Sequence, residues 1–231
     1  MMAKLILDDL EVEVIRKNIK HIYLSVQPPG DRVRMTVPSR IDQETIVIFA
    51  RSKLDWIRKQ QAKLRARPVQ PDFEYVNGES HLYFGKPYLL KVVATSGRQR
   101  VELSAEGSMN LYVRPSSTRD ERQRVLRVWY RRQLQAAIPT YIEKWEKRIG
   151  VSVQEWKVRQ MKTKWGSCNI QARRIWLNLE LVKKSPRCLE YIIVHEMIHL
   201  LERYHNARFY SYLTKYLPDW KERRKELNSS G

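Results

Sequence analysis

Residues 191–205 read YIIVHEMIHLLERYH, a stretch that combines a long apolar run with three histidines. Just before it, Ser185 and Pro186 are typical of a helix N-cap and a first helical residue, so we predict a helix from about Ser185 into the low 200s. Apolar residues lie nearly all round this helix, and a helix of that kind is buried in a core. The polar side chains within it are therefore the first candidates for a functional site.

The three histidines have the spacing of metal ligands. His195 and His199 are four residues apart, so both can present a ring nitrogen to one ion from the same helix face. Glu196 is rotated by about 100° from His195, which places its carboxylate beside the ion, where it can take a proton from a metal-bound water. His205 follows six residues after His199 and can return as a third ligand after a turn. Three protein ligands and one open position are the arrangement of a catalytic zinc ion.

We therefore expect one catalytic Zn²⁺ ion held by the three histidines, with Glu196 as the catalytic base of a hydrolase. The zinc would lower the pKa of its water and polarise a substrate carbonyl, so no covalent intermediate is needed. The alternative is a buried His–Glu pairing without metal, but these side chains are costly in an apolar helix unless something satisfies them. The metzincin class does not fit, because Glu202 stands at its glycine position and no methionine follows Met197.

Composition and charge narrow the class of protein. The chain has 231 residues, and 44 Lys and Arg against 25 Asp and Glu give a net charge of +19. A hydrophobic content of 42% excludes a disordered chain, while Cys168 and Cys188 are too few for a disulfide-built scaffold and suit a reducing compartment. No apolar run reaches the ~18–20 residues of a membrane helix, and acids occupy the N-terminal stretch where a signal peptide needs apolar residues. We expect a soluble, cytoplasmic protein without membrane contact.

The order of patterns along the chain predicts an α+β fold whose N-terminal region is mostly β. Residues 22–37 alternate in polarity around a Pro-Pro-Gly-Asp turn, which predicts a hairpin, and Asp42 caps a predicted helix that runs to about Leu64. Residues 66–71 read as a linker. Further short strands are expected at 73–76, 81–84, 88–94, 101–103 and 109–113.

The pattern becomes helical in the second half of the chain. Ser117 and Asp120 resemble a capping box, an amphipathic stripe follows, and Pro139 should kink or split this helix. Two more strands are expected, at 158–165 and 175–179. We therefore divide the chain into a mostly β region with one helix, residues 1–115, and a catalytic region, residues 116–231.

Several motifs of this chain are specific in combination. In the C-terminal half they are TKWGSCN at 163–169, IWLNLEL at 175–181 and YIIVHEMIHLLERYH at 191–205. In the N-terminal half they are the 22–37 hairpin with Pro38, RSKLDWI at 51–57 and NGESHLYFGKPYLLKV at 77–92. Together they closely resemble the YgjP-like metallopeptidase family, which is related more distantly to SprT-like and other small zincins.

The resemblance implies a peptidase that acts on peptide or protein substrates, with His195, His199 and His205 as zinc ligands and Glu196 as the base. It also implies a zincin-like fold, in which a small sheet packs on the active-site helix. The edge strand of that sheet, expected at 175–179, would line the cleft and could bind an extended peptide by strand addition.

Other residues near the predicted centre have two interpretations. The segment at 165–168, Trp-Gly-Ser-Cys, is either a loop beside the metal in which Gly166 allows close backbone approach, or a buried Trp, a turn glycine and a structural thiol. We assign both cysteines to packing. The weaker candidates are Tyr204, Tyr210 and Tyr212 as oxyanion donors or packing residues, Asn178 as a substrate or strand contact, and Glu202 as the partner of a ligand histidine.

Basic residues gather in clusters and leave a second function open. Arg124, Arg127 and Arg131 share one face of the predicted helix, where they could bind phosphates without sequence preference. The alternative is a solvated helix face with ion pairs. The rival to the peptidase is therefore a basic, nucleic-acid-associated binding protein with a structural or vestigial zinc site. A peptidase recruited to nucleic acid would combine both features.

Overall fold

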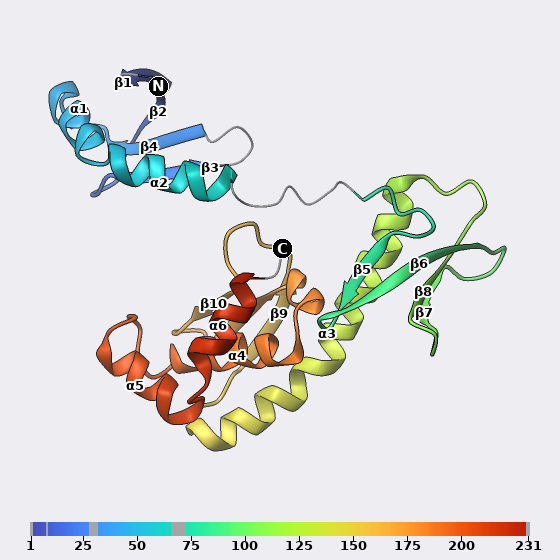
Figure 1. Ribbon diagram of the computed structural model, residues 1–231. Helices are drawn as coiled ribbons and strands as arrows, with labels where there is room; N and C mark the ends of the chain where they lie inside the picture. Colours follow the sequence, from blue (N-terminus) through green and yellow to red (C-terminus); the bar gives the residue numbers. More distant parts are fainter. Residues whose placement is uncertain (1, 8, 28–31, 66–72, 230–231) are drawn as a thin grey trace. The chain divides into compact units, whose positions relative to one another are not determined.

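Two compact units make up the computed structural model of the chain (Figure 1). The residues described are 2–7, 9–27, 32–65 and 73–229. The first unit lies within residues 1–71 and the second within residues 72–230. The predicted linker, residues 66–71, lies outside the described residues. The division predicted at residue 115 falls inside the second unit and stays a prediction about domain organisation.

The first unit is a four-stranded sheet packed against two helices. Its strands are β1 (Met2–Leu7), β2 (Leu10–Lys17), β3 (Tyr23–Gln27) and β4 (Arg32–Pro38), in the order β1-β2-β4-β3. β2 and β4 run parallel, and the outer pairs are antiparallel. Ile46 of α1 (Gln43–Ser52) and Ile57 of α2 (Leu54–Arg65) join Met35 in the core. This unit is thus a small α+β fold with a core of its own.

The predicted hairpin in the first unit is confirmed. β3 and β4 pair antiparallel, with Leu24 opposite Met35, as the alternation of apolar residues indicates. Its turn, residues 28–31, lies outside the described residues. The two strands before it, β1 and β2, were not among the predicted elements.

The predicted helix at 42–64 is in fact two helices. Its start is correct, because the Asp42 carboxylate accepts a hydrogen bond from the Thr45 N–H at 2.8 Å. α1 then ends at Ser52, where the Lys53 N–H turns back to the Ala50 carbonyl at 3.1 Å. The break redirects the chain before α2 begins at Leu54, and both helices still bury an isoleucine against the sheet.

The second unit begins with a sheet that contains four of the five predicted strands. Its strands are β5 (Ser80–Tyr83), β6 (Lys86–Ala94), β7 (Arg100–Leu103) and β8 (Ser108–Val113), in the order β5-β6-β8-β7. The strand predicted at 73–76 is wrong, because the Glu79 carboxylate accepts the N–H groups of Glu74 at 2.7 Å and Tyr75 at 2.9 Å. A side chain thus takes the place of a neighbouring strand.

A single helix of 31 residues, α3 (Arg119–Ile149), links this sheet to the C-terminal part of the unit (Figure 1). Its capping box is one residue later than predicted, at Thr118 and Glu121 instead of Ser117 and Asp120. The Thr118 hydroxyl accepts the Glu121 N–H at 3.3 Å, and the Glu121 carboxylate accepts the Thr118 N–H at 2.9 Å. This reciprocal pairing satisfies two N–H groups at the start of the helix.

Pro139 does not split α3, which was one of the two effects predicted for it. The helix continues through it to Ile149 and ends at Gly150, which adopts the left-handed conformation with φ of 77° that favours glycine. Buried side chains lie on both sides of the proline, including Leu134 and Ile142. Their packing holds the helix together across the hydrogen bond that proline removes.

The predicted basic stripe on α3 is only partly exposed. Arg124 and Arg127 are exposed, but the Arg131 guanidinium donates to the backbone carbonyl of Val158. One of the three arginines therefore links α3 to the following strand.

The C-terminal sheet has three strands. They are β9 (Glu155–Arg159), β10 (Gly166–Asn169) and β11 (Arg174–Asn178), in the order β10-β11-β9. The prediction of an edge strand at 175–179 is therefore wrong: β11 is the central strand, and it buries Ile175 and Leu177 fully. The strand predicted at 158–165 lies earlier, at β9, and residues 160–165 form a loop that leads into β10.

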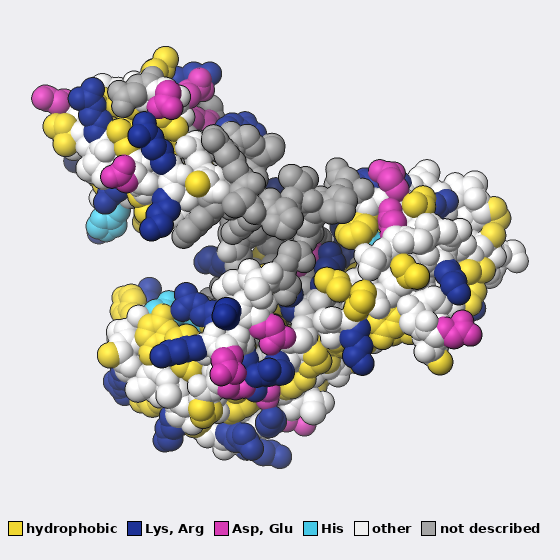
Figure 2. All heavy atoms as spheres, in the orientation of Figure 1, with side chains coloured by type: hydrophobic (Ala, Val, Ile, Leu, Met, Phe, Trp, Pro, Cys, Tyr) yellow, Lys and Arg dark blue, Asp and Glu magenta, His cyan; other side chains and the backbone are white. Residues whose placement is uncertain are grey.

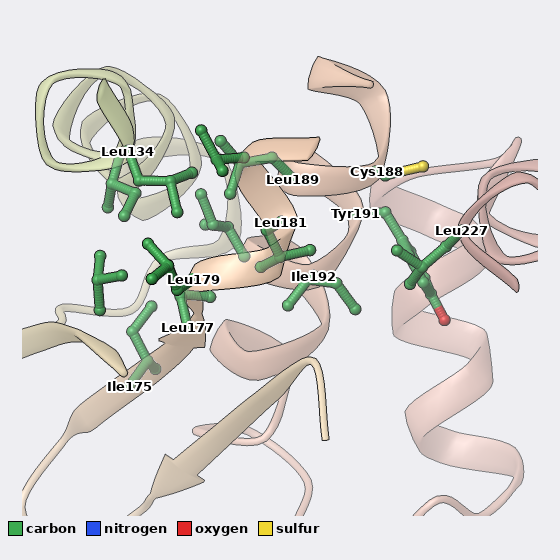
Figure 3. Packing of buried hydrophobic residues seen from close by; sticks show 14 of the residues in the cluster. Leu134, Ile175, Leu177, Leu179, Leu181, Cys188, Leu189, Tyr191, Ile192 and Leu227 are labelled. Atoms are coloured by element: carbon green, nitrogen blue, oxygen red, sulfur yellow. The ribbon is translucent and has the colours of Figure 1, made fainter. Parts of the chain in front are cut away.

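The helix predicted from Ser185 lies at the centre of this part of the fold. The elements after β11 are the 3₁₀ helix η1 (Leu179–Lys183), α4 (Pro186–Ile198), α5 (Ala207–Tyr216) and α6 (Trp220–Ser229). α4 contacts β10, β11, α3, α5 and α6, and its Leu189 and Ile192 lie among buried residues of its neighbours (Figure 3). The predicted α+β fold, with a small sheet on this helix, is confirmed. None of the described helices is long and apolar enough to cross a membrane.

A buried carboxylate fixes α4 against two other helices. Glu190 accepts hydrogen bonds from Lys144 at 2.6 Å and Trp145 at 3.0 Å, both on α3, and from Arg223 on α6 at 2.7 Å. Burial alone would raise the pKa of Glu190, but these hydrogen bonds hold it below its ordinary value of 4.5.

We expect Glu190→Ala to lower the free energy of unfolding by about 3 kcal/mol at pH 7, because it leaves the Trp145 indole N–H without its acceptor and removes one of the two acids that pair with the largely buried Arg223. A depressed pKa stabilises the folded state above the ordinary value of 4.5, so the loss should shrink as the pH falls below it. Chemical denaturation across pH measures this. Glu143→Ala, an exposed acid on α3, is the control and should stay within about 0.5 kcal/mol of wild type. Equal stability of the two variants at pH 7 would contradict the role of Glu190.

Candidate metal centre

The chain reverses its direction directly after the end of α4. α4 ends at Ile198, earlier than predicted, and His199 is its C-cap residue. The following N–H groups close tight turns, with Leu200 bonded to the Met197 carbonyl at 3.0 Å and Leu201 to the Ile198 carbonyl at 2.8 Å. This early end lets the chain reverse before α5 begins.

The reversal brings all three predicted ligands together. One ring nitrogen from each of His195, His199 and His205 lies within 4.8 Å of the others. The Nε2 atoms of His195 and His205 face each other at 2.9 Å. On a tetrahedral ion with ligand distances near 2.0–2.1 Å, two ligand nitrogens lie about 3.3 Å apart, so the cluster has the right scale.

A backbone carbonyl orients the ring of His199. His199 Nδ1 lies 3.1 Å from the Glu202 carbonyl oxygen, and because a carbonyl only accepts, Nδ1 carries the hydrogen. Nε2 of His199 is then left with its lone pair, the state that binds metal. Glu202 thus supports a ligand histidine, as suggested from the sequence, but through its backbone. Its carboxylate accepts the Tyr204 N–H at 3.1 Å.

Burial keeps the helix histidines neutral. It lowers the pKa of His195 to about 3, with smaller contributions from the neighbouring histidines, and it lowers the pKa of His199 as well. Neutral imidazole is the form that coordinates a metal. His195 Nδ1 is buried and has no hydrogen-bond partner among the described residues. These residues fit a divalent ion with nitrogen ligands.

The Phe209 ring packs against all three histidine rings. Its ring centroid lies 4.9 Å from that of His195 and 4.7 Å from those of His199 and His205, and the side chain is fully buried. It stands on the first turn of α5, where the Asn206 side chain accepts its N–H at 3.0 Å. Phe209 was not among the predicted site residues. Because His205 precedes α5, which begins at Ala207, no helical spacing in the sequence pairs the two rings.

Glu196 lies against the backbone of the neighbouring strand. Burial raises its pKa to about 8, and the positive charge of Lys164 opposes that rise. A Cβ atom at Gly166 would lie 2.5 Å from the nearer carboxylate oxygen of Glu196 and 2.7 Å from its Cγ. Gly166, the first residue of β10, therefore allows the close backbone approach that the sequence suggested for it, and the element approaching it is the candidate base.

The two cysteines are free thiols. Cys168 is half-buried on β10, where burial and the nearby Glu196 carboxylate raise its pKa to about 12. Cys188 is buried at the start of α4, and burial raises its pKa too. Both stay uncharged at neutral pH, which supports their assignment to packing.

Asn178 organises the loop in front of Gly166. Its side-chain NH₂ donates to the carbonyls of Met161 at 2.8 Å and Lys164 at 2.7 Å, and its backbone N–H donates to Trp165 at 2.9 Å. Its side-chain oxygen accepts the Glu180 N–H at 3.2 Å and so caps η1. Asn178 was suggested as a contact to the substrate or to a strand. Its side chain is buried, and its backbone N–H bonds to the residue before β10, so the structure supports the strand contact.

The tyrosines after the motif lie in three different environments. Tyr204 is 65% exposed, and the Tyr212 hydroxyl accepts hydrogen bonds from Arg208 at 3.2 and 3.3 Å. Tyr210 stacks on Trp220 at 5.3 Å and lies 6.4 Å from the His205 ring. Of the three, only Tyr210 has a ring contact with a ligand histidine in the described structure.

Three converging histidine nitrogens, with a buried glutamate next in sequence to one of them, are the arrangement of a metal-dependent hydrolase. A family model described as YgjP-like, metallopeptidase domain, matches residues 20–230. The chain therefore belongs to the YgjP-like metallopeptidase family, as its motifs indicate. Among solved structures, the metallopeptidase zymogen abylysin of Pyrococcus abyssi is similar over 38% of this chain and 90% of its own, with 20% identity and a TM-score of 0.36. A comparison with curated proteins gave no match.

We expect Gly166→Ala to lower the free energy of unfolding by about 1–3 kcal/mol, because the new methyl group overlaps the buried Glu196 carboxylate. Denaturant unfolding measures this loss. Gly97→Ala is the matched control, since its Cβ would meet only the Thr95 hydroxyl at 3.5 Å, an ordinary contact. If both variants unfold like wild type, the close approach to Glu196 is not a constraint on residue 166.

Proposed function

We propose that this protein is a zinc-dependent metallopeptidase in which His195, His199 and His205 hold one catalytic Zn²⁺ ion and Glu196 is the catalytic base. The observation that carries the proposal is the convergence of three histidine nitrogens at the end of a buried helix that also carries the buried carboxylate of Glu196. Membership of a metallopeptidase family supports metal-dependent peptide hydrolysis. The choice of zinc rests on the all-nitrogen, three-ligand donor set, which suits catalytic zinc.

Glu196 performs the proton transfers in this proposal. A zinc ion at the histidines would supply Lewis acidity to the scissile carbonyl and lower the pKa of a water there. Glu196 takes a proton from the water as the water oxygen bonds to the carbonyl carbon. It then gives that proton to the amine nitrogen as the C–N bond breaks. Burial supports this role, because it raises the proton affinity of the carboxylate.

The edge strand β10 is the proposed site for the substrate backbone. In the described structure β10 pairs only with β11, so its other side offers unpaired N–H and C=O groups. An extended peptide can add to such an edge by strand addition. Because Gly166 at the start of β10 touches Glu196, a peptide held there passes the base.

The proposed location is the cytoplasm. The two free thiols, Cys168 and Cys188, support it, since structural cysteines stay reduced in that compartment.

Metal analysis tests the ligand set. We expect protein purified without chelators to contain about one zinc per chain by elemental analysis. Each of His195→Ala, His199→Ala and His205→Ala should lose most of this zinc, because its affinity for zinc should fall by about 10–100-fold or more. His21→Ala, an exposed histidine of the first unit, is the control and should keep its zinc. Wild-type protein without zinc would overturn the proposal.

Glu196→Gln tests the base. We expect the variant to keep zinc but to lose hydrolysis of unfolded casein or a quenched-fluorescent peptide library by about 10²–10⁴-fold, because the amide cannot take the proton. Glu106→Gln, an exposed acid in a turn, should keep full activity. Retained activity in Glu196→Gln would remove Glu196 as the base. Zinc binding without hydrolysis by wild type would instead favour the structural-zinc alternative.

A further inference from the structure

The last helix, α6, separates its charges onto two faces. Its acids Glu222 and Glu226 lie toward Arg187, with ion pairs at 3.9 and 4.0 Å. On another face, four residues recur at i, i+3, i+4 and i+7. These are Lys221, Arg224, Lys225 and Asn228, which we call the α6 basic face.

The cations of the α6 basic face have no acidic partner among the described residues, and Lys221 alone has a ring contact, with Trp220 at 5.8 Å. All three are exposed. Together with Asn228 and Ser229 they line a shallow hollow in the surface. In a protein of net charge +19, an unpaired group of cations adds self-repulsion, which a bound anion would relieve.

Ring contacts connect the α6 basic face to the metal centre. Lys221 Nζ lies 5.8 Å from the Trp220 ring, Trp220 stacks on Tyr210 at 5.3 Å, and Tyr210 lies 6.4 Å from the His205 ring. Near the end of α6, Leu227 belongs to the same buried cluster as Tyr191, whose ring lies 5.9 Å from that of His195 (Figure 3). The buried face of α6 thus packs on Tyr210 and Tyr191, which in turn contact ligand histidines, and the α6 basic face borders that buried face.

Charge effects agree with this placement. Burial raises the pKa of Tyr191, and the Arg224 guanidinium opposes that rise, so its charge reaches the helix that carries the ligands. Figure 2 shows Lys and Arg side chains in dark blue among the other surface side chains of the second unit. The His205 and Tyr210 rings lie 6.4 Å apart, and the Tyr210 and Trp220 rings lie 5.3 Å apart. About four residues of an extended peptide can span these two distances together.

We propose that the α6 basic face is a substrate subsite, which binds the carboxylates of an acidic peptide segment a few residues from the bond that is cleaved. This inference rests on the proposed peptidase function and names its substrate class. An acidic peptide fits better than a nucleic acid, because the face is only one helix stripe wide. A duplex presents a charge about every 1.7 Å and needs a longer basic surface.

Binding to the full-length, zinc-loaded Glu196→Gln protein tests the subsite without depending on turnover. The probes are a fluorescent peptide rich in Glu and the same peptide with Gln in place of Glu, followed by anisotropy across a salt series. We expect the acidic peptide to bind about tenfold tighter at low salt, with the preference fading as salt rises. Arg224→Glu with Lys225→Glu should abolish the preference, and the double alanine variant should reduce it.

A matched control separates the subsite from the overall charge. Arg124→Glu with Arg127→Glu changes the net charge equally at exposed positions of α3 and should keep the preference for the acidic peptide. Equal loss in both double variants, or no preference in the parent protein, overturns the inference. It is also overturned if single-stranded DNA binds more tightly than the acidic peptide and the α6 variant loses that binding.

Cleavage assays distinguish a failure of the subsite from a failure of the proposed peptidase function. If wild type cleaves the Gln peptide and the α6 variant cleaves both peptides as wild type does, the peptidase stands and the subsite is wrong. If wild type cleaves neither these peptides nor unfolded casein but the acidic peptide binds through α6, the α6 basic face still binds acidic peptides, and the peptidase function and the role of the face as a substrate subsite are both wrong.

Discussion

A buried helix that carries ionisable side chains imposes the constraint on which the C-terminal part of this protein depends. Each polar group of α4 needs a partner inside the fold, because burial without one is costly. Glu190 has cations and an indole N–H from two other helices, and His199 has the Glu202 carbonyl. Glu196 lies against a strand whose first residue, Gly166, has no side chain to displace it. The neighbours of α4 are thus arranged around its polar residues as well as its apolar ones.

The basic excess of the chain has two different uses. Part of it is structural, because three arginines of α3 donate to backbone carbonyls that other segments would leave unpaired. These pairs are Arg119 with Phe73, Arg122 with Tyr75 and Arg131 with Val158. These hydrogen bonds join segments that are distant in sequence. Arginines that form them are less available to bind a polyanion than the net charge of the chain suggests. The cations of α6 differ, since they point to solvent.

The candidate site was predictable from the sequence where local spacing determines it. His195 and His199 share a helix face by their four-residue spacing alone, and the 22–37 hairpin follows from alternation around a turn. The central place of β11 was not predictable, because strand order depends on pairings between distant segments. The same holds for Phe209 under the histidines and for Asn178, whose partners lie 14 and 17 residues earlier in the chain. α3 continues through Pro139 because packing on both sides outweighs the low helix propensity of proline.

The uninterrupted helix α3 has a consequence for how the second unit unfolds. Its first turns bury Leu126 and Tyr130, its last turns bury Trp145 and Ile149, and all belong to one continuous hydrophobic cluster that also contains the β5–β8 sheet. A break at any point along it would expose apolar surface on both sides of the break. The sheet and the metal centre therefore share one cooperative transition, and amide protons of β6 and of α4 should exchange with solvent through the same global opening.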